Sequence, residues 1–131
     1  MAVLLASGGM ALHIQNDDLP GNETSRTFLG RDHGGVPVSF FIQASPNGHG
    51  PKPHRHPYAE VFVLHEGSGT FLAGDATIEA TGGSVVVVPA GELHGFTASS
   101  AGPLRMTCIH TNDEMVTEWA SLAAEDDDQH P

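Results

Sequence analysis

Six short apolar segments, separated by Gly, Pro, Asn and Asp at intervals of about ten residues, constrain the fold more than any other feature. Each segment is rich in Val, Ile, Phe and Thr, which are favoured in β-strands. Turn sequences such as GDAT and TGGS tolerate the positive φ angles that hairpins need. The pattern predicts a single all-β domain, either a sandwich or a small barrel. The segments are 36–43, 59–67, 69–74, 76–81, 84–89 and 103–110.

The C-terminal region, residues 111–124, has the periodicity of one short helix. Thr111 or Asn112 can cap its N-terminus, and the two acidic residues that follow complement the helix dipole. Apolar residues then recur at helical spacing, which favours packing of the helix on the β domain. They are Met115, Trp119 and Leu122. The acidic residues of 125–131 predict a solvated, disordered tail.

Composition excludes several classes of function. The chain of 131 residues has 16 acidic and 5 Lys or Arg residues, which gives a formal charge of −11. Such a surface repels phosphate backbones and anionic lipids, so we expect no nucleic-acid or membrane partner. Cys108 is the single cysteine and allows no internal disulfide. No segment has the roughly 20 apolar residues of a membrane helix, and we expect a cytoplasmic protein.

Two histidines and a glutamate share one face of the chain near its middle. His54 and His56 are two residues apart, so both imidazoles point the same way from an extended backbone. Glu60 keeps this parity, and Phe62 and Leu64 continue the face as apolar. An inward carboxylate is costly to bury without a partner. A bound cation is the simplest way to satisfy all three polar groups.

A fourth polar residue follows the next long apolar strand. The segment 82–96 predicts a buried strand that ends at Pro89, a turn at Gly91, and His94 turned back toward the barrel axis. Three imidazoles and one carboxylate suit Fe, Mn, Ni, Co, Cu or Zn, and they leave coordination positions open. The alternative is a solvated histidine-rich loop without a role. We interpret His65 and His110 as solvated strand ends.

The spacing of these residues resembles both motifs of the cupin superfamily. Residues 48–67 read Gly, five residues, His, one, His, three, Glu, six, Gly. Residues 83–98 read Gly, five, Pro, one, Gly, two, His, and they depart from the motif only at the last position, often Asn, which is Ala98 here. The resemblance implies a cupin-like jelly-roll β-barrel over 1–110, with 1–10 as an arm or extension. It also implies a homodimer.

The resemblance assigns one divalent transition metal per chain to His54, His56, Glu60 and His94. The fold hosts many activities, so three functions remain open. The first is a metal-dependent oxygenase that acts on a small organic substrate, with Glu60 as ligand and catalytic base. The second is a non-redox isomerase, lyase or decarboxylase, and the third is a binding module without turnover. The candidate pocket residues are Phe40, Gln43, Tyr58, Phe62, Phe96, Arg105 and Met106.

Overall fold

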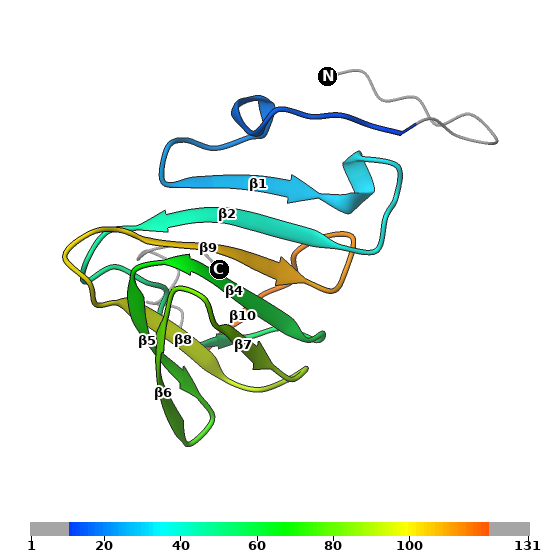
Figure 1. Cartoon of the computed structure of the whole chain (residues 1–131). Helices are drawn as coiled ribbons and strands as arrows, with labels where there is room; N and C mark the ends of the chain where they lie inside the picture. The colour runs from blue at the N-terminus through cyan, green and yellow to red at the C-terminus, as the bar shows by residue number, and fades with distance from the viewer. Residues whose placement is uncertain (1–10, 121–131) are drawn as a thin grey trace.

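The computed structural model describes residues 11–120, which form two antiparallel five-stranded sheets (Figure 1). Sheet A has the order β1-β2-β9-β4-β7, and sheet B has the order β10-β3-β8-β5-β6. The strands of sheet A are β1 (Ser25–Leu29), β2 (Ser39–Ser45), β4 (Glu60–Glu66), β7 (Val85–Val88) and β9 (Leu104–His110). Those of sheet B are β3 (His54–Arg55), β5 (Ser68–Ala73), β6 (Ala76–Thr81), β8 (His94–Ala98) and β10 (Glu118–Trp119).

The sheets pack face to face around one apolar core. Side chains of β2, β4 and β9 alternate between buried and partly exposed, as expected of strands with one face inward. Aromatic rings from both sheets meet at the centre: the ring of Phe62 lies 5.1 Å from that of Phe71 and 5.9 Å from that of Phe96. Burial of this alternating apolar set drives the fold, which is the all-β architecture that the strand pattern predicts.

Strands far apart in sequence are neighbours in both sheets. β4 lies between β9 and β7, and β8 lies between β3 and β5, so the chain crosses repeatedly between the sheets as in a jelly roll (Figure 1). In the resulting register, His54 is directly opposite His94, and Glu60 is directly opposite His110. The topology therefore brings four separated polar residues toward one end of the barrel.

The helix predicted for 111–124 is not present in its described part, 111–120. This part is irregular and ends in β10, whose Trp119 pairs with His54 of β3. The backbone N–H of Ala120 extends the pairing by donating to the carbonyl of Pro53 at 3.1 Å. Tertiary pairing thus overrides a weak local propensity. Residues 1–10 and the acidic tail 125–131 lie outside the described residues.

Regular helix in residues 11–120 consists of two short 3₁₀ turns, η1 (Asn16–Asp18) and η2 (Gly30–Asp32). In this part of the chain, no helix has the length and apolar character needed to cross a membrane.

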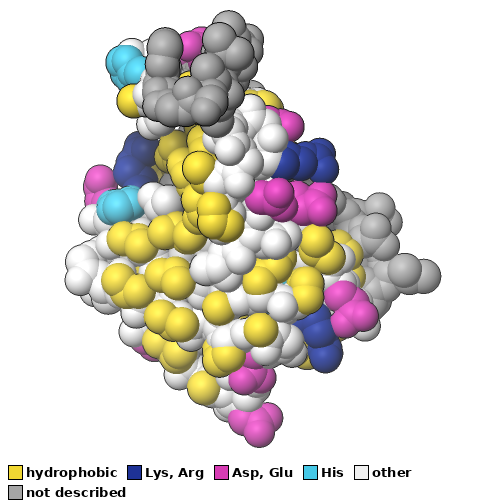
Figure 2. All heavy atoms as spheres, turned by 90° about the vertical axis from the view of Figure 1, so that its right-hand side faces the viewer, with side chains coloured by type: hydrophobic (Ala, Val, Ile, Leu, Met, Phe, Trp, Pro, Cys, Tyr) yellow, Lys and Arg dark blue, Asp and Glu magenta, His cyan; other side chains and the backbone are white. Residues whose placement is uncertain are grey.

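The outer face of sheet A carries mainly apolar side chains. Strand register aligns two rows of outward side chains across it, and Figure 2 shows apolar side chains gathered on this face. Val85 and Val87 on β7 are 57% and 61% exposed. One charged residue, Arg26 on the edge strand β1, lies in these rows, directly opposite Ile42. One row is Phe28, Phe40, Ile109, Val61 and Val87, and the other includes Ile42, Thr107, Val63 and Val85.

Candidate metal centre

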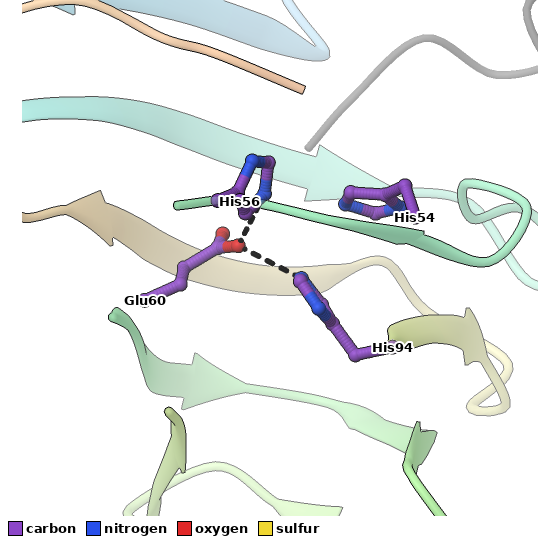
Figure 3. Close-up of side chains that lie close together, drawn as sticks. All are labelled: His54, His56, Glu60 and His94. Carbon is purple, nitrogen blue, oxygen red and sulfur yellow. Dashed lines mark hydrogen bonds and ion pairs between the residues drawn. The ribbon is translucent and has the colours of Figure 1, made fainter. Parts of the chain in front are cut away.

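Four potential metal ligands lie together inside the barrel, as the sequence spacing predicts (Figure 3). His54 and His94 come from neighbouring strands of sheet B, His56 follows β3, and Glu60 begins β4 of sheet A. One ligand atom from each lies within 4.8 Å of the other three. All four residues are at most 3% exposed. The alternative of a solvated histidine loop is therefore wrong.

Turn geometry places the fourth ligand. Gly91 has a φ of 80°, a conformation that favours glycine, in the turn between β7 and His94. Its backbone N–H donates to the carbonyl of His56 at 2.8 Å, so the turn is fixed to the loop that carries the first two histidines. The glycine of the second sequence motif thus has a direct structural reason.

The three ligand histidines share one tautomer. Nδ1 of His54 lies 2.8 Å from the carbonyl oxygen of Lys52, and Nδ1 of His94 lies 2.9 Å from that of Glu92. Nδ1 of His56 lies 2.8 Å from the carbonyl oxygen of Val116. A carbonyl only accepts hydrogen bonds, so each Nδ1 carries the proton and each Nε2 presents a lone pair to the cluster. This is the state that metal coordination requires.

The inward atoms fit a cation. Nε2 of His56 and Nε2 of His94 each lie 3.0 Å from Oε1 of Glu60. With the proton of each ring on Nδ1, these contacts would join lone pairs to a carboxylate oxygen, and a cation between them, either a proton or a metal ion, makes the arrangement favourable. Buried Nε2 atoms of His54 and His56 have no hydrogen-bond partner. One metal ion held by the four residues would satisfy all of these atoms.

Electrostatics favour the charge states of a metal site. Burial raises the pKa of Glu60, but contacts with His110, His56 and His94 outweigh it and hold this pKa well below the usual range. Burial lowers the pKa of His54 to about 4. An ionised carboxylate and a neutral imidazole at pH 7 are the ligand forms that bind a divalent metal.

His110 is a further residue at the site, and its interpretation as a solvated strand end is wrong. Its side chain is fully buried, and its Nε2 lies 3.2 Å from Oε2 of Glu60. Its Nδ1 lies 2.6 Å from the hydroxyl of Tyr58. Burial raises the pKa of Tyr58 to about 12, so the phenol keeps its proton. The parity of β9 does not by itself assign His110 to the site, because its role depends on the direct pairing of β9 with β4, which places it opposite Glu60.

The C-terminal segment 111–120 covers the ligand loop. Besides accepting from His56, Val116 donates its backbone N–H to the Tyr58 hydroxyl at 3.0 Å. A hollow of about 290 Å³ lies beside His56 at this end of the barrel. The other lining residues are Arg55, Pro57, Gly91, Val116 and Glu118. This hollow gives a small molecule a place next to one ligand.

Two of the candidate pocket residues lie elsewhere. Phe40 points outward from β2 and stacks on Phe28 with ring centroids 4.6 Å apart. Arg105 lies on the exposed side of β9 and pairs loosely with Glu66 at 3.8 Å. Strand parity explains both differences. The inward positions of β2 are odd-numbered, so Phe40 points outward, and the inward positions of β9 are even-numbered, so Arg105 does too.

The other candidate pocket residues face inward or lie at the site. Gln43 is buried, and its side-chain amide donates to the hydroxyl of Ser45 on the same strand at 3.1 Å. Tyr58 lies at the site through its contact with His110. The remaining three are buried members of the apolar core. They are Phe62, Phe96 and Met106.

A family comparison agrees with this geometry. The AraC-like ligand binding domain matches residues 36–129, which include both motifs and most of the described strands. The chain belongs to this family. Its fold is that of the cupin superfamily, in agreement with the resemblance carried by the motifs. No match was found among curated proteins.

Solved structures share the fold at low sequence identity. Oxalate decarboxylase from Bacillus subtilis matches with a TM-score of 0.74 and 15% identity over 86% of this chain, which spans 33% of that protein. An oxalate oxidase matches with a TM-score of 0.65 and 15% identity over 82% of this chain and 60% of its own. A cupin 2 conserved barrel domain protein from Rhodopseudomonas palustris matches with a TM-score of 0.59 and 18% identity. The match covers 68% of this chain and 61% of that protein. These likenesses establish the barrel fold.

Proposed function

We propose that this cupin is a metal-dependent oxygenase that acts on a small organic substrate entering beside His56. The observation that carries the proposal is the convergence of three Nε2 lone pairs and one carboxylate oxygen in a buried cluster. Four protein ligands leave positions open on a metal that prefers a higher coordination number. Iron or manganese bound there would supply both a Lewis acid and a redox couple.

The chain's own residues would hold, screen and orient. The backbone carbonyls of Lys52, Glu92 and Val116 fix the ring orientation of the three ligand histidines. The buried ring of Phe62 lies 6.1 Å from that of His94, and Phe96 packs on Phe62, so apolar rings keep water from this side of the cluster. Because these rings close one side of the cluster, an incoming molecule would reach it from the hollow beside His56.

Glu60 supplies the negative charge of the ligand set. Both of its oxygens contact imidazoles: Oε1 contacts His56 and His94, and Oε2 contacts His110. We therefore propose that Glu60 contributes to turnover mainly as an ionised ligand that tunes the metal, and less as a free base. A substrate that chelates through two oxygens, such as an enol, a phenol or a diketone, would suit the open positions.

The functional alternative is non-redox metal chemistry. The fold similarity includes both an oxalate decarboxylase and an oxalate oxidase, so this barrel supports proteins named for either kind of reaction. A module that binds a ligand without turnover agrees with the description of the family as a ligand binding domain. Dependence of turnover on dioxygen distinguishes an oxygenase from a non-redox enzyme. Any turnover distinguishes both of these from a binding module.

An oxygen electrode tests the proposal. Protein loaded with Fe²⁺ or Mn²⁺ is supplied with a panel of phenols, enols and diketones, and we expect oxygen uptake that needs both substrate and metal. Glu60→Gln retains the shape of the side chain but removes its charge, so uptake should fall by more than metal occupancy does. Anaerobic conversion of a panel compound without any oxygen uptake would instead establish the non-redox reading.

We further propose that the protein is a homodimer that buries the outer face of sheet A. The two rows on this face contain exposed Val85 and Val87, one basic residue, Arg26 on the edge strand β1, and none of the acidic residues that give the chain its formal charge of −11. A second copy of the same chain meets least electrostatic repulsion on such a face. Exposed apolar patches of this kind are typical of interfaces.

A further inference from the structure

We propose that Tyr58 and His110 are positioning residues that fix Glu60 as a one-oxygen ligand: Tyr58 sets the tautomer of His110, and His110 donates to Oε2 of Glu60. The inference rests on the proposed metal centre, and it assigns a role to two residues that are outside the four-ligand set. It does not depend on which reaction the metal serves.

Hydrogen-bond direction begins at the backbone of Val116. Its N–H donates to the Tyr58 hydroxyl at 3.0 Å, which uses a lone pair of that oxygen. The phenolic proton is then free to donate to Nδ1 of His110, and the 2.6 Å separation of these atoms indicates a strong bond. The other ring nitrogen near the hydroxyl, Nδ1 of His56 at 3.5 Å, carries its own proton and cannot accept, so the direction of the chain is fixed.

The tautomer of His110 is opposite to that of the three ligand histidines. Because its Nδ1 accepts from Tyr58, a neutral ring carries its proton on Nε2. Nε2 lies 3.2 Å from Oε2 of Glu60. A ring of this tautomer presents no lone pair to a metal and acts as a donor to the carboxylate. In agreement, His110 is outside the four residues whose ligand atoms lie within 4.8 Å of one another.

The two oxygens of Glu60 are thereby given different tasks. Oε1 faces His56 and His94, whose Nε2 lone pairs point into the cluster, and Oε2 faces the N–H of His110. A hydrogen bond to Oε2 disfavours coordination by both oxygens, so the carboxylate occupies one position on the metal. The arrangement keeps a coordination position open for the substrate.

Burial makes the assignment energetically significant. His110 and Glu60 are both fully buried, so water cannot replace a lost donor. Oε2 of Glu60 and Nε2 of His110 lie 3.2 Å apart, and neither atom has a hydrogen-bond partner among the described residues, so the bond between them that we propose would satisfy both. A variant that removes the donor leaves a buried carboxylate oxygen unpaired, which destabilises the ionised ligand.

Metal affinity measured by chelator competition tests the inference without reference to activity. We expect His110→Leu to weaken Mn²⁺ binding by about 10- to 100-fold, the usual effect of losing a group that supports a ligand. His110→Gln keeps an N–H donor near the same place and should stay within about threefold of wild type. Tyr58→Phe should weaken binding about tenfold, because the ring of His110 is then free to change tautomer. His33→Leu, at a buried histidine bonded to the carbonyl of Leu29, is the matched control.

Counting coordinated imidazoles gives a second readout, and it does not use His110→Leu. Pulsed electron paramagnetic resonance of the Cu²⁺-loaded wild type should detect three imidazoles, and His110→Gln should give the same number. Four in wild type and three in His110→Gln would make His110 a ligand and overturn the proposal, as would an unchanged affinity in folded His110→Leu. A wild type that binds no metal would overturn the metal centre itself, whereas loss of oxygen uptake with metal still bound would affect only the proposed reaction.

Discussion

The indole ring of Trp119 lies 5.0 Å from the imidazole ring of His54, with the two ring centroids as the measured points. Trp119 is the single tryptophan of the chain. The contact exists because β10 pairs with β3, so the C-terminal segment reports directly on a candidate metal ligand.

We therefore expect tryptophan fluorescence to follow metal binding. Paramagnetic Cu²⁺ or Co²⁺ held by His54 would quench the emission of Trp119 at this short separation, and Zn²⁺ would quench it much less. Titration of chelator-treated protein gives the measurement, and His94→Ala, which removes a ligand but leaves the indole in place, is the control. Equal quenching in His94→Ala would separate the signal from the proposed site.

Variants of single ligands should lose metal and retain the fold. His56→Ala and His94→Ala each remove one buried ligand atom, and we expect metal affinity to fall by more than about 100-fold. Circular dichroism should stay that of a β protein, because the apolar core lies outside the ligand set. His49→Ala, at an exposed histidine near the first motif, should leave affinity unchanged. Equal losses at His49 and His94 would refute the ligand assignment.

Acid should destabilise the metal-free protein in a defined range of pH. The folded state lowers the pKa of His54 to about 4 from 6.5, so the unfolded state binds more protons between these values. Stability therefore falls as the pH drops from 6.5 to 4, by up to about 3 kcal/mol. The depressed pKa of Glu60 adds a loss of the same sign at lower pH. Urea midpoints measure the effect, and the profile of His54→Gln should be flatter.

The oligomeric state should depend on the outer face of sheet A. Light scattering after size exclusion should give a dimer for wild type and a monomer for the double variant Val85→Lys and Val87→Lys, because two buried positive charges per copy oppose association. Thr77→Lys, at an exposed position of β6, is the control and should remain dimeric. A wild-type monomer at high concentration would contradict the proposed interface.

The sequence predicts six strands and the cluster of four candidate ligands, because both depend on local patterns. Alternation placed His54, His56 and Glu60 on one face, and this parity is what the structure shows. The six predicted strands correspond to β2, β4, β5, β6, β7 and β9. The sequence analysis does not predict β1, β3, β8 and β10 as strands, although the motif identifies His94, the first residue of β8.

What the sequence could not give depends on long-range pairing. The contact of His110 with Glu60 follows from the register of β9 against β4, and no local pattern specifies that register. The segment 111–120 has helical periodicity, but its pairing with β3 and the hydrogen bonds of Val116 to His56 and Tyr58 determine its structure. Phe40 lies outside the pocket because the inward positions of β2 are the odd-numbered ones, and residue type alone does not specify this parity.

Metal content is the most direct measurement of the central claim, which is that His54, His56, Glu60 and His94 form one metal centre. Protein loaded separately with Mn²⁺, Fe²⁺, Co²⁺, Ni²⁺ and Zn²⁺, and then freed of loosely bound ions, should retain about one ion per chain of at least one of these metals. Chelator at acid pH should remove the ion as the imidazoles become protonated. Retention of none of the five metals, in protein whose β fold is intact, would contradict the account.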